Sequence, residues 1–118
     1  MAGIETLRRQ RDIDRVFRGG RWRRMPAVAV GMYVRGDAEV TRVAFVAGRR
    51  VGNAVRRNRS RRRLREAWRL MAERVRPGAY VVVVARDRTA DVDFRRLQAQ
   101  VGEALAAEGL LDGADDRR

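Results

Sequence analysis

Alternating positions predict two strands in the first half of the chain. From Ala27 to Val34 the side chains fall into two sets, Val28, Val30, Met32 and Val34 on one face and Ala29, Gly31 and Tyr33 on the other. Gly36 and Asp37 interrupt the pattern, and residues 41–47 form a second apolar run. Two runs joined by a short turn predict a hairpin, and residues 21–25 predict a short additional edge strand.

Helical spacing appears on both sides of these strands. Asp12 is a suitable cap for a short helix with Ile13, Val16 and Phe17, which Gly19-Gly20 ends. Residues 1–11, polar and rich in arginine, are expected to be loosely ordered. Asn53 is a suitable cap for a long helix that runs to about Val75, where Pro77-Gly78 stops it. Its predicted core face contains Leu64, Ala67, Trp68, Met71 and Val75.

The long helix is expected to be about 35 Å long. Few apolar residues occur in its first half, so the C-terminal turns should anchor it while the N-terminal turns project outward. Residues 80–85 are apolar on both faces, which is typical of a strand covered on both sides. This strand should lie in one sheet with 41–47, giving a strand–helix–strand crossover.

A last amphipathic helix completes the pattern. It is entered at Asp91–Asp93, ends at Gly109, and has an apolar face of Phe94, Leu97, Val101, Ala104 and Leu105. The prediction is an α/β fold, an α+β sandwich with the order helix, strands, helix, strand, helix and about four strands. Residues 1–111 should form a single domain, and residues 112–118 a disordered tail.

Charge is concentrated in one part of this fold. The 118 residues have a formal net charge of +13, and every basic residue is arginine. Residues 1–84 contain 22 arginines and 7 acidic residues, whereas residues 85–118 contain 6 and 8. A coding bias explains most of the absence of lysine but not the position of the arginines. The basic surface therefore belongs to the first two thirds of the chain.

Ten of the 21 residues from Arg49 to Arg69 are arginine, and only Glu66 is acidic. A run of charge is usually a solvated helix face, but such faces mix signs and occupy one side. Here three stripes surround the helix: Arg56, Arg59 and Arg63; Arg57, Arg61 and Arg65; and Arg62, Arg65 and Arg69. One opposite-charge pair stabilises a helix by only about 0.2–0.5 kcal/mol, so Glu66 cannot offset this repulsion. The pattern favours a nucleic-acid partner.

Several other classes are excluded by composition. The chain has no cysteine and no histidine, which excludes disulfides, thiolate chemistry, histidine-based metal sites and histidine general-base catalysis. The longest apolar run, Ala79 to Ala85, is too short to span a bilayer. The N-terminus has no apolar signal region, so a cytoplasmic location is expected. A stand-alone nuclease would need clustered carboxylates for two metal ions, and the acidic residues are scattered in sequence.

The order of elements and the run VGNAVRRNRSRRRLREAWR resemble the protein component of bacterial ribonuclease P. The resemblance covers most of the chain. It rests on an Arg-Asp-x-x-x-Val-Phe helix from Arg11 to Phe17, a strand ending at Tyr33, and a basic pair before Val-Gly-Asn-Ala-Val from Arg49 to Val55. The Arg-Asn-Arg signature at 57–59, Arg-Glu-Ala-aromatic-Arg at 65–69 and a strand ending in Ala85-Arg86 complete it.

The resemblance implies an α/β sandwich with an unusual left-handed strand–helix–strand crossover. It also implies that a large RNA performs hydrolysis with Mg²⁺, which the RNA mainly binds. The protein would be an accessory subunit, inactive alone, that helps to bind precursor tRNA and remove its 5′ leader. The expected partners are the catalytic RNA and precursor tRNA, with no membrane and no obligatory protein partner evident. The alternative is a ribosomal or general RNA-binding protein without a processing role.

Site residues follow from the same resemblance. Contacts to the catalytic RNA are assigned to Arg49, Arg50, Asn53, Arg56, Arg57, Asn58, Arg59, Arg61, Arg62, Arg65 and Arg69. Contacts to the leader are assigned to Ile13, Phe17, Tyr33 and Arg86, and core packing is the alternative role for Phe17. Ile13 stands where the family commonly has phenylalanine, which removes one stacking surface. Ala47-Gly48 replaces a more usual Val-Ser pair, and Arg49, Arg50 and Arg61 stand where lysine is common.

Overall fold

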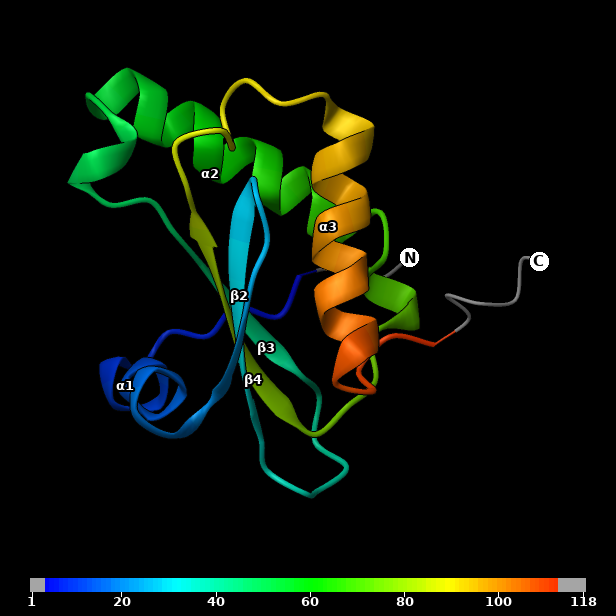
Figure 1. Ribbon diagram of the computed structural model, residues 1–118. Coiled ribbons are helices and arrows are strands. Elements are labelled where there is room, and N and C mark those ends of the chain that lie inside the picture. The colour runs from blue at the N-terminus through cyan, green and yellow to red at the C-terminus, as the bar shows by residue number, and fades with distance from the viewer. Residues whose placement is uncertain (1–3, 113–118) are drawn as a thin grey trace.

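A computed structural model of the chain describes residues 4–112 (Figure 1). In chain order the elements are α1 (Gln10–Gly19), β1 (Arg21–Arg24), β2 (Val28–Val34), β3 (Arg42–Val46), the 3-10 turn η1 (Arg49–Val51), α2 (Ala54–Arg69), the 3-10 turn η2 (Ala72–Arg74), β4 (Ala79–Ala85) and α3 (Phe94–Ala107). The predicted α+β architecture is confirmed, as is the short edge strand β1.

The four strands lie in the order β1-β2-β4-β3. β4 pairs with β2 antiparallel and with β3 parallel, which confirms the strand–helix–strand crossover through α2. The predicted hairpin between the second and third strands is therefore wrong, because β4 lies between them. The physical reason is burial: β4 is the strand that is apolar on both faces, and a central position covers it on both sides.

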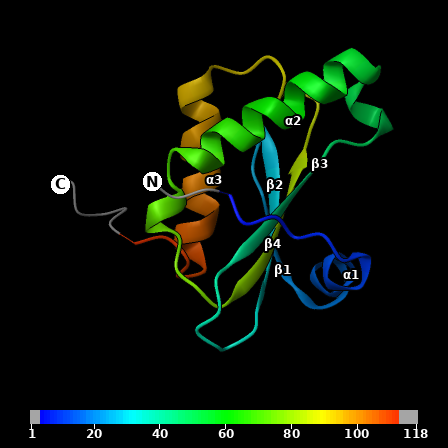
Figure 2. The same cartoon turned by 180° about the vertical axis from the view of Figure 1, so that it is seen from behind.

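Helices cover the two faces of the sheet unequally. In Figures 1 and 2, α2 and α3 cross one another over one face, and α1 lies against the other. The larger core lies beneath α2 and α3, and it includes Val30, Val81, Leu64 and Leu97. Beneath α1 a smaller cluster forms around Val16 and Val82. Much of the α1 face is therefore only half-buried, notably at Val46 and Val84.

The segment before α1 is more ordered than predicted. Leu7 is buried, its N–H donates to the carbonyl of Val43 (2.8 Å), and the Val43 N–H donates to the carbonyl of Glu5 (2.9 Å). The expectation of a loose stretch over 1–11 is thus wrong for residues 5–7, which pair with β3, and for residues 10 and 11, which belong to α1. The segment occupies the free edge of β3, where backbone groups would otherwise have no partner. α1 begins at Gln10, so Asp12 lies in its first turn and is not its cap.

α2 is shorter than predicted. It ends at Arg69 after 16 residues, a length of about 24 Å. The chain then tightens, the Met71 N–H donating to the carbonyl of Trp68 (2.9 Å), and Val75 forms a bridge with Leu111. The helix ends early because residues 74–76 pair with the segment after α3. The predicted core positions of Leu64, Ala67, Trp68 and Met71 are confirmed, and Val75 is half-buried.

The end of the chain contributes to the same pairing. α3 follows Asp93 and ends before Gly109, which has the positive φ of +76° that favours glycine. The Asp112 N–H donates to the carbonyl of Arg74 (2.7 Å), and its side chain pairs with Arg76. The prediction of disorder over residues 112–118 is wrong for Asp112, and residues 113–118 lie outside the described residues.

Candidate nucleic-acid interface

The arginine-rich helix α2 begins at a well-formed cap. Gly52 has a φ of +139°, and the next residue, Asn53, accepts a hydrogen bond from the Arg56 N–H through its side chain (2.9 Å). The predicted cap is confirmed. On the buried side of α2, Ser60 is fully buried ahead of Leu64, which the sequence pattern did not predict. This small residue lets the N-terminal half of α2 approach the rest of the fold.

Arg56 is used inside the protein. Its guanidinium pairs with Asp91 (Nη2 to Oδ2, 2.6 Å), and it also donates to the backbone carbonyls of Val51 (2.9 Å) and Asp87 (3.0 Å). The hydrogen bond from Arg56 lowers the pKa of Asp91 below its ordinary value of 3.8. The same pair raises the pKa of Arg56. Arg56 therefore links the start of α2 to the loop after β4.

The other two arginines of this stripe make similar contacts. Arg59 Nε donates to the carbonyl of Ala90 (2.9 Å). Arg63 donates through Nη1 to the carbonyl of Thr89 and through Nη2 to that of Val92, each at 2.6 Å. The expectation that the first turns of α2 project outward is thus wrong for this stripe. It faces the loop between β4 and α3, which passes beside α2 in Figure 1.

The remaining arginines of α2 face away from this loop. Arg57 donates to the carbonyl of Gly52 (3.0 Å), Arg61 to the side chain of Asn58, and Arg65 lies 5.2 Å from the centre of the Phe45 ring. Arg69 forms an ion pair with Glu66 (2.5 Å), and their hydrogen bond lowers the pKa of Glu66. Arg62 is exposed, with no hydrogen bond or ion pair to its side chain from residues 4–112. The arginines on these faces of α2, together with the exposed Arg49 and Arg50 of η1, offer guanidinium groups to a polyanion.

The face of the sheet beneath α1 brings together aromatic side chains. Tyr33 and Tyr80 are neighbours across β2 and β4, with ring centres 6.5 Å apart and an angle of 24° between the planes. Both are half-buried, and Ile13 of α1 packs into the same cluster. The guanidinium of Arg35 lies 4.7 Å from the centre of the Tyr80 ring. This arrangement fixes the two rings side by side.

Phe17 lies farther along α1 and is 52% exposed. Its ring centre is 5.1 Å from that of Trp22 in β1. Trp22 in turn covers Gly31, where a β-carbon would come within 2.5 Å of the indole ring. Phe17 is thus not a core residue, and it forms an accessible aromatic pair at the edge of the sheet.

Arg86 lies at the opposite end of β4 from Tyr80. Arg86 directly follows β4 and is six positions beyond Tyr80, about 20 Å along an extended chain. With Arg50 and Arg88 it lines a hollow of about 450 Å³, whose other lining residues are Pro26, Val51, Ala85 and Asp87. The structure therefore brings together Arg50, predicted to contact the catalytic RNA, and Arg86, predicted to contact the leader. It places Arg86 at the far end of β4 from Tyr33, which lies on β2 and pairs with Tyr80.

Sequence reasoning missed Trp22, Tyr80, Arg63 and Arg88. Trp22 could have been noticed in the alternation of the Arg-Trp-Arg-Arg stretch, which places one aromatic residue on the sheet face. Tyr80 shares an apolar run with the six other residues of β4, and nothing in that run marks it as accessible. The contacts of Arg63 depend on a loop about 30 positions away in sequence. Only the tertiary structure shows them.

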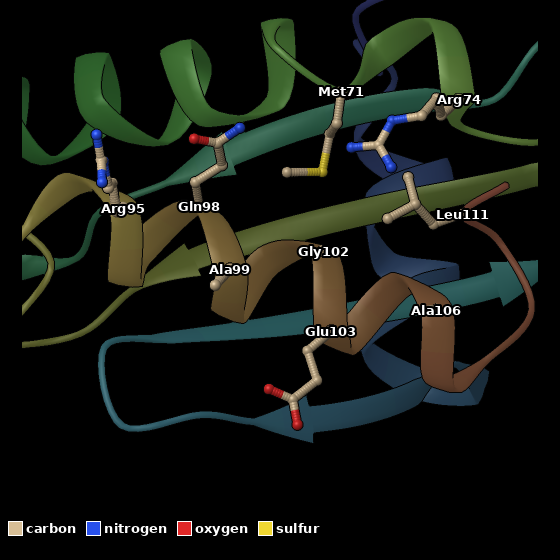
Figure 3. Close-up of a pocket in the computed structure, with 9 residues that line it drawn as sticks. All are labelled: Met71, Arg74, Arg95, Gln98, Ala99, Gly102, Glu103, Ala106 and Leu111. Carbon is tan, nitrogen blue, oxygen red and sulfur yellow. The ribbon is translucent and has the colours of Figure 1, made fainter. Parts of the chain in front are cut away.

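A groove of different character lies elsewhere. It has a volume of about 520 Å³ and runs between α3 and the end of α2, with an apolar floor that includes Met71, Ala99 and Leu111 (Figure 3). Arg74, Arg95 and Glu103 line it as well, so it has no single sign of charge. Its chemistry does not match the arginine-rich surface.

Two further features bear on function. Among residues 4–112, no group of three or more acidic side chains converges as a metal site would require. Within the same part of the chain, no helix is long and apolar enough to cross a membrane.

Comparison with known proteins identifies a family that this chain matches. The family model described as Ribonuclease P matches residues 1–108. The ribonuclease P protein component of Symbiobacterium thermophilum is 54% identical over 71 residues, covering 60% of this chain and 62% of that protein. This match spans less than two thirds of the relative. The ribonuclease P protein component of Ruegeria pomeroyi is 39% identical over 110 residues, covering 88% of this chain and 86% of that protein.

Solved structures agree with the fold. The RNase P protein of Thermotoga maritima has a TM-score of 0.70 and 28% identity, covering 82% of this chain and 91% of that one. The RNase P protein of Staphylococcus aureus has a TM-score of 0.77 at 18% identity, covering 93% of this chain and all of that one. At that identity the likeness concerns the fold alone.

Proposed function

Because the chain belongs to the ribonuclease P protein family, we propose that it is the protein subunit of ribonuclease P. In this role it binds the catalytic RNA and the 5′ leader of precursor tRNA and assists removal of the leader. The observation that best supports this is the presence of two chemically different surfaces in one small domain, which adjoin at the hollow lined by Arg50 and Arg86. One is arginine-rich, on α2 and η1, and the other is an aromatic face beneath α1 that ends at Arg86.

The α2 surface suits a folded RNA. Guanidinium groups bind phosphates in a bidentate manner, and Arg62 and Arg50 are exposed for this purpose. The N-terminal end of α2 adds partial positive charge at the same place. We assign the catalytic RNA to this surface.

The aromatic face suits a single strand. Stacking on Tyr33, Phe17 and Trp22 does not depend on base identity, as a subunit that serves many leaders requires. The exposed Arg86 directly follows β4 at the end of this face, where it would pair with a phosphate. We assign the leader to this track.

In this proposal the RNA subunit carries out the hydrolysis. The described residues do not fit a Mg²⁺ site of their own, because their acidic side chains do not converge. We therefore assign the Mg²⁺ that supports hydrolysis to the RNA subunit. This chain binds and orients substrate, and it is expected to be inactive alone.

A cleavage assay on precursor tRNA tests the proposal, with the protein alone, the matching RNA alone, and both at physiological Mg²⁺. The protein alone should not cleave, and adding it to the RNA should mainly raise substrate affinity. Equal affinity and rate with and without the protein would contradict the proposal.

Two variants test the separation of surfaces. Tyr33→Leu keeps apolar packing but removes a stacking ring, and a lost stack costs about 1–3 kcal/mol. It should weaken binding of precursor tRNA and leave mature tRNA and assembly unchanged. Arg62→Ala should weaken assembly and reduce the slope of log affinity against log salt by about one phosphate contact. If both variants weaken both equilibria equally, the two-surface assignment is wrong.

A further inference from the structure

The segment between β4 and α3, residues 86–93, is held by arginine side chains. Within the segment, the Thr89 N–H donates to the Arg86 carbonyl (3.0 Å), and the Val92 N–H donates to the Arg88 carbonyl (2.9 Å). These turns leave the carbonyls of residues 87, 89, 90 and 92 without backbone partners. Each of those four accepts instead from Arg56, Arg59 or Arg63 of α2.

Arg63 makes the most complete contact of the three. Its two terminal nitrogens reach the carbonyls of Thr89 and Val92 at 2.6 Å each, and its guanidinium lies 5.9 Å from the centre of the Phe94 ring. This use of a planar fork to bridge two acceptors is specific to arginine, since an ammonium group is a single point of charge. A half-buried guanidinium held at both ends is poorly placed to bind phosphate.

The held segment presents other arginines outward. Arg86 and Arg88 are exposed, and neither forms an ion pair with any residue of 4–112. Together with Arg50 they line the hollow of about 450 Å³ at the end of β4. Their positions depend on the backbone of residues 86–92, and α2 fixes that backbone through carbonyl contacts.

We infer that Arg63 is a positioning residue for RNA binding, which holds residues 86–92 so that Arg86 and Arg88 are ordered before the leader arrives. The inference rests on the proposed function. On this model, Arg56, Arg59 and Arg63 of α2 bind the segment between β4 and α3, and the other faces of α2 bind RNA. Because α2 also meets the catalytic RNA, one helix then couples the two surfaces.

The test compares charge-conserving and charge-removing variants of the reconstituted enzyme at Arg63 and at Arg95, an exposed arginine of α3 outside both RNA-binding surfaces: Arg63→Lys, Arg63→Ala, Arg95→Lys and Arg95→Ala. The single ammonium group of a lysine cannot bridge two carbonyls as a guanidinium does. Arg63→Lys should therefore resemble Arg63→Ala, with faster amide exchange at residues 89–92. Its preference for leader-bearing over leaderless tRNA should fall roughly 5- to 150-fold, the cost of ordering two long side chains on binding. Arg95→Lys and Arg95→Ala should both resemble the unmodified protein, because Arg95 belongs to neither RNA-binding surface.

A control separates this role from a general loss of stability. Leu105→Val destabilises α3 at its far end, where Leu105 is fully buried, and should leave the leader preference unchanged. If Arg63→Lys retains both the leader preference and the amide protection, or if Leu105→Val loses the preference equally, the inference is overturned. An unmodified holoenzyme with no leader preference would instead contradict the proposed function.

Discussion

Replacing Thr89 by valine tests how the loop that bears Arg86 is joined to the sheet. Thr89 is fully buried, its hydroxyl donates to the carbonyl of Ala27 (2.5 Å), and it accepts from the Arg86 N–H (2.8 Å). Valine has the same shape but no hydroxyl. The substitution therefore leaves two backbone groups without their partner while leaving the volume of the side chain almost unchanged.

The magnitude follows from the burial of those groups. An unsatisfied buried group costs about 1–3 kcal/mol. Ala27 is fully buried, so its carbonyl should incur most of that cost, whereas the N–H of exposed Arg86 has access to water. We expect a total loss of about 2–4 kcal/mol in the free energy of unfolding. For a domain of this size that lowers Tm by roughly 8–16 °C.

Urea denaturation and thermal unfolding, followed by circular dichroism, measure both quantities. Thr89→Ser is the matched control, because it keeps the hydroxyl and loses one methyl group, worth about 1 kcal/mol. Thr89→Val should be clearly less stable than Thr89→Ser. The opposite order, or equal stabilities, would refute the assignment of these hydrogen bonds.

Two further predictions concern the start of α2. Asn53→Ala removes the capping side chain and should lower the free energy of unfolding by about 1 kcal/mol. Asn53→Asp is the control, because it retains an acceptor for the Arg56 N–H. If urea denaturation gives the same loss of stability for both variants, the capping role is wrong. The second concerns pH: because Arg56 lowers the pKa of Asp91, their pair stabilises the fold above the ordinary pKa of 3.8, and this contribution is lost as pH falls through the lowered value. Asp91→Asn should thus be less stable than the unmodified protein at neutral pH and equal to it in acid, and a difference in unfolding free energy that persists in acid would argue against the pair.

Local patterns in the sequence determined the elements. The alternation from Val28 to Tyr33 assigned each residue of β2 to its correct face, because side chains of a strand point to opposite sides whatever the partner. Asn53 marked the start of α2, since capping needs only the next three residues. The density of arginine between 49 and 69 pointed to a nucleic acid, and membership of the family agrees with that interpretation.

Long-range contacts decided what those patterns could not. β4 lies between β2 and β3 because only a central position buries both of its faces. The residues of a strand do not by themselves determine which other strands pair with it. Residues 5–7 become ordered because β3 has a free edge, which no local property of that stretch reveals.

The same distinction applies within the arginine-rich helix. Arg62 and Arg63 are adjacent and chemically identical in the sequence. In the structure Arg62 is exposed, whereas Arg63 binds the carbonyls of Thr89 and Val92. Sequence determines that α2 is surrounded by positive charge. Folding decides which guanidinium groups bind RNA and which bind the protein itself. The deciding factor is the position of carbonyls that lack a backbone partner, since a buried acceptor must find a donor.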